Sequence, residues 1–166
     1  MSWPLVIVLL VALQRLAELV YARRNERRLR AFGAIEVGAG HYPLLVLLHA
    51  GWLLALLLVV PADAPLSGGW LAVFLLLQLG RLWVIASLGR FWTTRILALP
   101  DAPLVRRGPY RLLRHPNYWI VAGEIAILPL AFGAVWVAVV GSLLNAALLL
   151  WRVRVEETVL APRRAL

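Results

Sequence analysis

The side chains best suited to chemistry lie in two polar clusters, one at each end of the last long apolar block. The first covers residues 106–118 and reads Arg-Arg-Gly-Pro-Tyr-Arg-Leu-Leu-Arg-His-Pro-Asn-Tyr, and the second covers residues 152–157 and reads Arg-Val-Arg-Val-Glu-Glu. Together they hold one of the three histidines, six of the seventeen arginines and two of the eight acids. Arginine positions anions, and histidine or glutamate can take a proton. These clusters are therefore the candidate site.

The apolar block between the clusters predicts a helical hairpin. Residues 118–151 are apolar for too long a stretch to form one comfortable span, and Leu128-Pro129 followed by Gly133 interrupts them near the middle. We expect helices over residues 118–132 and 134–151. Because a hairpin returns the chain to the membrane face that it left, the two clusters should be neighbours.

Local spacing gives two further expectations, each with a plainer alternative. Asn117 is expected as the N-cap of the helix that follows His115-Pro116, a pair that can equally be an ordinary helix start. Arg152 and Glu156 are four residues apart on one helix face, which suits a salt bridge, or a solvated ion pair of small energetic value.

Composition places the chain in a membrane. The 166 residues fit one domain, 63% of them are hydrophobic, and the mean hydropathy is +0.84. The chain has no cysteine, so disulfides, thiolate metal sites and a cysteine nucleophile are excluded. The net charge of +9 comes wholly from arginines that flank apolar spans, and the positive-inside rule with anionic lipid head groups explains most of them. No basic stripe with stacking aromatics lies outside the apolar blocks, so no nucleic-acid partner is expected.

The elements that must position the clusters are three earlier spans, expected over residues 3–21, 44–60 and 70–88. The arginines of residues 23–30 predict a cytoplasmic loop, and residues 32–40 predict a glycine-rich connector. Residues 89–117 form the main cytoplasmic segment, in which residues 90–97 fit either a short strand or a helix extension. The prediction is an all-α integral membrane protein of about five helices with its amino terminus outside. Residues 1–89 would form three spans, and residues 90–166 would form a second region that contains both polar clusters and the hairpin.

Polar residues inside the spans have two interpretations each. Gln14, Arg15 and Glu18 lie close together in the second half of the first span. They mark either an interfacial end of this helix or a wall of a substrate cavity. Arg81 either snorkels to the interface or faces a polar cavity. Glu124 is expected to pair with Arg81 or to accept a hydrogen bond from Asn145, and His49 is expected to make a helix-packing hydrogen bond.

A longer pattern carries a resemblance. Leu104-Val105-x-x-Gly108-Pro-Tyr110-Arg-x-x-Arg114-His115-Pro116-Asn-Tyr118 is followed, after about thirty-five largely apolar residues, by Arg152-x-Arg154-x-Glu156-Glu157. This resembles the isoprenylcysteine carboxyl methyltransferase family of integral membrane enzymes over roughly residues 90–160. The resemblance implies that residues 90–166 form a catalytic region with S-adenosylmethionine as cofactor, in a cytoplasmic cofactor pocket lined by Leu104, Val105, Gly108, Tyr110, His115, Pro116 and Tyr118. It also implies that one or both of Glu156 and Glu157 hold the cofactor, and that Arg152 or Arg154 steadies the acceptor oxygen, with Arg152, Arg154 and Glu156 as catalytic residues and no metal.

The sequence departs from the family pattern at several positions. Ala102 stands where many members have histidine, Trp119 where glycine is common, and residues 130–133 replace an Asn-Pro turn. His115-Pro116 with Glu124-Ile-Ala-x-Leu-Pro is more similar to a short bacterial branch, some members of which methylate lipidic polyketides such as alkylpyrones or alkylresorcinols. For a phenolic or enolic acceptor, His115 or a glutamate becomes a candidate base.

The resulting hypothesis is an O-methyltransferase of the bacterial inner membrane whose active site faces the cytoplasm. Its partners would be membrane lipids and a lipophilic small-molecule or prenylated acceptor that enters from the bilayer. The rivals are a non-enzymatic transporter or lipid-binding scaffold and, more remotely, a reductase that uses a nicotinamide cofactor. A transporter should show paired inverted repeats with broken helices, and the sequence shows none.

Overall fold

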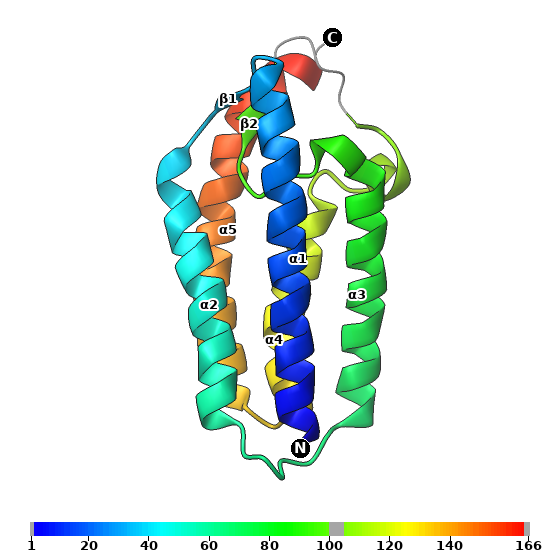
Figure 1. Cartoon of the computed structure of the whole chain (residues 1–166), viewed down its shortest axis with the longest axis vertical. Helices are drawn as coiled ribbons and strands as arrows, with labels where there is room; N and C mark the ends of the chain where they lie inside the picture. The colour runs from blue at the N-terminus through cyan, green and yellow to red at the C-terminus, as the bar shows by residue number, and fades with distance from the viewer. Residues whose placement is uncertain (1, 100–104, 165–166) are drawn as a thin grey trace.

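Five α-helices run along the long axis of the molecule, and a small two-stranded sheet lies at one end (Figure 1). The computed structural model describes residues 2–99 and 105–164, with side chains up to Val159. The helices are α1 (Trp3–Ala31), α2 (Tyr42–Val59), α3 (Gly68–Leu88), α4 (Pro116–Ala131) and α5 (Val135–Arg164). Three single-turn 3-10 helices join them: η1 (Ala39–His41), η2 (Gly89–Phe91) and η3 (Gly108–Arg111). The all-α prediction is therefore correct apart from the small sheet.

Four of these helices are long and apolar enough to cross a membrane, which makes the chain an integral membrane protein. They are α1, α2 with η1, α3 with η2, and α5 up to Val159. Helix α4 has 16 residues, which at about 1.5 Å per residue gives roughly 24 Å, short of the hydrocarbon thickness. Helix α4 packs against both α3 and α5.

The prediction of a loop over residues 23–30 is wrong, because α1 continues to Ala31. Its inward face continues through the arginine run, where Ala22, Asn25, Glu26 and Leu29 are buried at helical spacing. Arginine is itself a good helix former, so nothing in the run stops the helix. The arginines between these positions are exposed. Helix α5 likewise extends through the second polar cluster, which the sequence placed where the helix ends.

The carboxyl ends of α1 and α5, the sheet and η3 gather at one end of the bundle, at the top of Figure 1, which we call the arginine-rich end. The sheet pairs β1 (Ile35–Glu36) with β2 (Leu97–Ala98) in antiparallel register. It joins the α1–α2 connection, expected to be a plain connector, to the segment after α3. Residues 90–97 are thus neither a strand nor a helix extension as a whole: they hold the end of η2, a bend and the first residue of β2.

The hairpin of α4 and α5 is confirmed: α4 and the start of α5 lie within two residues of their expected bounds, whereas α5 continues past Trp151 to Arg164. Pro129 remains inside α4, and the helix ends two residues later. Gly133 adopts φ +72°, and the Ala134 amide bonds the Pro129 carbonyl at 2.9 Å, which closes the turn. The hairpin returns the chain to the arginine-rich end, as predicted.

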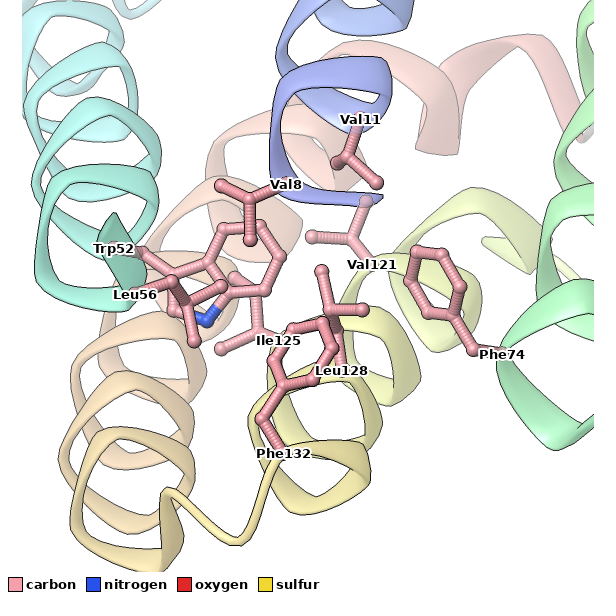
Figure 2. Packing of buried hydrophobic residues seen from close by; sticks show 9 residues of the cluster. All are labelled: Val8, Val11, Trp52, Leu56, Phe74, Val121, Ile125, Leu128 and Phe132. Carbon is pink, nitrogen blue, oxygen red and sulfur yellow. The ribbon is translucent and has the colours of Figure 1, made fainter. Parts of the chain in front are cut away.

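The main hydrophobic core lies between the helices in the half of the bundle away from the arginine-rich end (Figure 2). Helix α1 contributes Val8 and Val11, α2 contributes Trp52 and Leu56, and α3 contributes Phe74. The inward face of α4 and the residue after it complete the cluster with Val121, Ile125, Leu128 and Phe132. Because α4 and the residue after it supply four of the nine members, this short helix is central to the packing of the bundle.

Candidate functional site

The two polar clusters meet at the arginine-rich end, where α4 begins and α5 carries residues 152–157. His115 is the residue before the first turn of α4, so the N-cap is His115 and the expectation of Asn117 is wrong. Pro116 occupies the first helical position, where its fixed φ and missing amide proton are tolerated. This places Asn117 inside the first turn.

The Tyr118 hydroxyl joins an arginine to a glutamate. Arg152 donates from Nε to this hydroxyl at 2.8 Å, and the hydroxyl donates to Glu156. The expected direct salt bridge between Arg152 and Glu156 is therefore replaced by a bridge through Tyr118. The guanidinium carbon of Arg152 also lies 5.7 Å from the Tyr118 ring centroid.

His115 is held between two carboxylates and a ring. Its Nε2 lies 2.6 Å from Glu157 Oε1, its Nδ1 lies 3.6 Å from Glu156 Oε2, and its ring stacks on Tyr118 at 5.2 Å between centroids. The Glu156 and Glu157 carboxylates raise the pKa of His115 above its ordinary value, although partial burial works against them. The raised pKa favours the imidazolium more than in an exposed histidine, which makes His115 a partner for the two carboxylates.

A cavity of about 430 Å³ opens beside these groups. We call it the first cavity; its lining includes Phe91, Trp92, Arg95, Val105, Arg106, Tyr110, Arg114, His115, Asn117, Tyr118, Arg152 and Glu156. Burial raises the pKa of Tyr110, so its hydroxyl is neutral at ordinary pH. The lining combines aromatic faces, several guanidinium groups and a carboxylate, and its volume lies in the range of small-molecule sites, roughly 300–1,000 Å³.

A second cavity of about 410 Å³ adjoins the first, on the side of α1 and α2. Five residues line both: Trp92, Thr93, Asn117, Tyr118 and Arg152. The rest of its lining is mostly apolar and includes Ala12, Leu16, Leu19, Leu45, Val46, Ala50, Leu53, Val121 and Leu149. Leu16 and Val46 are also exposed on the outer surface, 60% and 42% respectively, so this cavity opens between α1 and α2 toward lipid.

Buried charges close the deep side of the second cavity. Arg15 and Arg81 each pair with both Glu18 and Glu124, at N–O distances between 2.5 and 3.2 Å. Gln78 donates to Glu124 at 2.8 Å, and Gln14 donates to Gln78 and Glu18. Of the two interpretations of Arg15 and Glu18, the cavity wall is correct, and Glu124 pairs with Arg81 rather than with Asn145. We call these six residues the charged network.

His49 also lines the second cavity, and its Nδ1 lies 2.8 Å from the Leu45 carbonyl, one turn back. This hydrogen bond lies within α2, so it is not the contact between helices that the sequence led us to expect.

Several predicted site residues lie outside both cavities. Arg154 is exposed on α5 and lines neither. Gly108 adopts φ +57°, and a Cβ there would lie 2.1 Å from Ser87 Oγ, so Gly108 packs η3 against α3. Pro116 is buried at the helix start, and Glu157 reaches the site through His115. Leu104 and Ala102 lie outside the described residues.

Other site residues were not predicted. Trp92 and Thr93 line both cavities and are fixed by Asn25, whose amide donates to the carbonyls of Gly89 and Trp92 at 3.1 and 2.9 Å. Asn25 is 1% exposed although it stands among arginines, so its position on the inward face of α1 was the available signal. The other missed feature is Arg95, which bonds Glu36 at 2.5 Å and lies over the Tyr42 ring, closing the arginine-rich end above the cavities.

Comparison with known proteins places this site in a family. The sequence model of the isoprenylcysteine carboxyl methyltransferase (ICMT) family matches residues 70–162, more than half of the chain. The chain belongs to this family. The matched range includes η3, both polar clusters and the hairpin, and membership indicates methyltransferase activity at a membrane.

Two relatives resemble almost the whole chain. A protein of Bacillus subtilis (strain 168), described as uncharacterized protein YpbQ, is 40% identical over 164 residues, which is 96% of each chain. An uncharacterized protein of Haemophilus influenzae is 28% identical over 143 residues, 83% of each chain. No solved structure matches the chain significantly.

Proposed function

We propose that the protein is an S-adenosylmethionine-dependent O-methyltransferase whose acceptor is lipophilic and reaches the site from the bilayer. The observation that carries this proposal is the shared wall of the two cavities at Trp92, Thr93, Asn117, Tyr118 and Arg152. One cavity is polar and aromatic, and the other is apolar and open toward lipid. A water-soluble cofactor and a lipidic acceptor can therefore meet at this wall from opposite sides.

The first cavity suits S-adenosylmethionine by its donor set. The guanidinium groups of Arg106 and Arg114 suit the cofactor's carboxylate, and the aromatic rings of Phe91 and Tyr110 suit its adenine. Glu156 is the carboxylate of the cavity and suits the ribose hydroxyls or the ammonium group. When bound, the cofactor supplies a methyl group whose bond to sulfur breaks as its bond to the acceptor oxygen forms.

The second cavity suits an acceptor with one polar end and an apolar body. Its apolar lining from α1, α2 and α5 would bury the body, and Arg152, Asn117 and Tyr118 would hold the oxygen at the shared wall. Transfer to an oxygen anion depends on alignment and exclusion of water, so an isoprenylcysteine-like carboxylate needs no base. A lipidic polyketide hydroxyl would have to lose its proton. Of the two candidate bases, Glu156 is better placed than His115 to take this proton, because it already accepts a hydrogen bond from the Tyr118 hydroxyl.

This arrangement gives the two halves of the chain different tasks. Most of the first cavity comes from residues 90–166, whereas helices α1 and α2 supply much of the second. We place the shared wall on the cytoplasmic side of a bacterial inner membrane, because the exposed arginines of residues 23–30 lie at that end of the bundle. The amino terminus then lies outside, and α4 counts as a fifth membrane helix.

The proposal is tested by transfer of a labelled methyl group to organic-soluble acceptors. Purified protein receives labelled S-adenosylmethionine with a prenylated cysteine carboxylate or a long-chain enolic or phenolic lipid. We expect label in at least one class, and a decrease of at least about tenfold in Tyr118→Phe and Glu156→Gln. Thr158→Ala, an exposed change on the same helix, is the control and should keep the wild-type rate. Label in none of the acceptors from folded protein that binds S-adenosylmethionine would reject the acceptor class, and equal rates in all variants would reject the site.

A further inference from the structure

Four arginines near the end of α1 have no acidic partner among the described residues. Arg23, Arg24, Arg27 and Arg28 are all exposed. The nearest acids along the chain are already engaged: Glu26 accepts from Thr94, and Glu36 pairs with Arg30 and Arg95. The hydrogen bonds from Arg95 and Arg30 hold the pKa of Glu36 below its ordinary value against the effect of burial, so it stays charged and committed to them. The four arginines therefore face their surroundings as uncompensated positive charge.

These arginines lie at the depth of lipid head groups. From Trp3, which is 70% exposed at the other end of α1, twenty residues to Arg23 at about 1.5 Å each span roughly 30 Å. That is the thickness of the hydrocarbon layer. An exposed tryptophan at one edge and exposed arginines at the other are typical of a helix fixed at both interfaces.

Helical spacing divides the four into two pairs with different surroundings. Arg23 and Arg27 continue the stripe of Leu16 and Leu19, since steps of three or four residues stay on one helix face. Leu16 and Leu19 line the mouth of the second cavity between α1 and α2. Arg24 and Arg28 are each one residue further, about 100° around the helix, and turn away from the mouth. Arg30, three residues after Arg27 on the same helix face, is paired with Glu36, so the unpaired arginines of this face end at Arg27.

We propose that Arg23 and Arg27 bind the phosphate of an anionic phospholipid at the cavity mouth between α1 and α2, two helices that lie side by side in Figure 1. Guanidinium groups pair with phosphate oxygens through two parallel hydrogen bonds, and two unpaired arginines favour a lipid whose head group has no positive charge of its own. The acyl chain of that lipid would run along Leu19 and Leu16, past Val46 of α2. The site thus combines a phosphate clamp with an apolar track, and an acceptor entering the second cavity passes this lipid.

The test measures lipid binding itself, so its outcome is independent of methyl transfer. Detergent-purified protein is mixed with phosphatidylglycerol or phosphatidylcholine of equal acyl length, and retained lipid is counted by native mass spectrometry. The variants are Arg23→Gln/Arg27→Gln and the matched pair Arg24→Gln/Arg28→Gln, which removes the same charge from the same helix at the same depth. Unchanged thermal unfolding midpoints in pure detergent show that the variants are folded.

We expect wild-type protein and Arg24→Gln/Arg28→Gln to prefer phosphatidylglycerol. Arg23→Gln/Arg27→Gln should reduce that preference about twenty-fivefold, because each arginine near anionic lipid contributes about fivefold. Arg23→Lys/Arg27→Lys should recover much of it, since lysine also binds phosphate. Equal losses in the two glutamine pairs would show a non-specific charged surface, and a wild type without preference would show no site. Either outcome overturns the proposal.

Discussion

At the scale of single residues, the Tyr118 hydroxyl is the centre of the hydrogen-bond network of the candidate site. It accepts a hydrogen bond from Arg152 and donates one to Glu156, so it links Arg152 of the shared wall to a carboxylate of the first cavity. His115 then takes the other side of Glu156 and the carboxylate of Glu157. Trp119, by contrast, is 71% exposed and lines neither cavity. That departure from the family pattern therefore leaves the site intact.

The His115 carboxylate contacts predict a pH-dependent stability. Since the folded state raises the pKa of His115 above its ordinary 6.5, the contribution of the imidazolium is fully present below that value and is lost as the pH rises through the folded-state pKa. His115→Asn should lower the free energy of unfolding by about 1–2 kcal/mol at mildly acidic pH, where carboxylates are still ionised, and by less at alkaline pH. Thermal unfolding of both proteins across the pH range measures this difference.

Glu157→Gln serves as the second variant for this prediction. It removes one of the two carboxylates, so the pH at which the His115 contribution disappears should move down toward the ordinary pKa. A stability difference between wild type and His115→Asn that is constant with pH would contradict the assignment of a charged histidine.

At the scale of elements, the charged network joins α1 to two other helices, α3 and α4, within the apolar part of the bundle. Arg15 and Glu18 come from α1, Arg81 from α3 and Glu124 from α4, and the side chains involved are 2–13% exposed. Charges buried this far from water are costly when unpaired, so each member depends on the others. The network also forms the deep wall of the second cavity, and its geometry therefore sets the position of α1 beside that cavity.

Removal of one charge from the network should destabilise the bundle more than removal of a pair. Glu124→Gln leaves Arg15 and Arg81 to share Glu18, and we expect a loss of about 3–5 kcal/mol. Glu124→Leu combined with Arg81→Met removes one charge of each sign and should cost less. Unfolding in detergent, followed by tryptophan fluorescence, gives both values. A loss below about 0.5 kcal/mol in Glu124→Gln would show that the network does not hold α1.

Some elements could be predicted from the sequence and others could not, for physical reasons. The hairpin was readable because Pro129 and Gly133 interrupt a long apolar block, and its consequence, that His115 meets Glu156 and Glu157, follows from topology. The continuation of α1 through the arginines was not read, because charge alone suggested a loop while the buried face of Asn25 and Leu29 decided the structure. The β1–β2 pair depends on contacts between segments about sixty residues apart, which no local pattern announces.

At the scale of the whole molecule, the hydrophobic core and the candidate site lie at opposite ends of the bundle. The apolar cluster centred on α4 holds the helices together at one end, and two cavities with a shared wall occupy the other. The first cavity is built largely within the family-matched range of residues 70–162, whereas α1 and α2 of the second lie outside it. The first cavity was accordingly the predictable part of the candidate site, and the second cavity required the structure.

The measurement that tests the account most directly is calorimetric binding of S-adenosylhomocysteine to detergent-purified protein. The wild type is compared with His115→Ala and Glu156→Ala, and Thr158→Ala is the exposed control on the same helix. We expect saturable binding by wild type and control, and binding weaker by about tenfold or more in the other two variants, because Glu156 lines the first cavity and His115 fixes it. Absence of binding by protein shown to be folded would contradict the methyltransferase assignment and favour a transporter or lipid-binding scaffold.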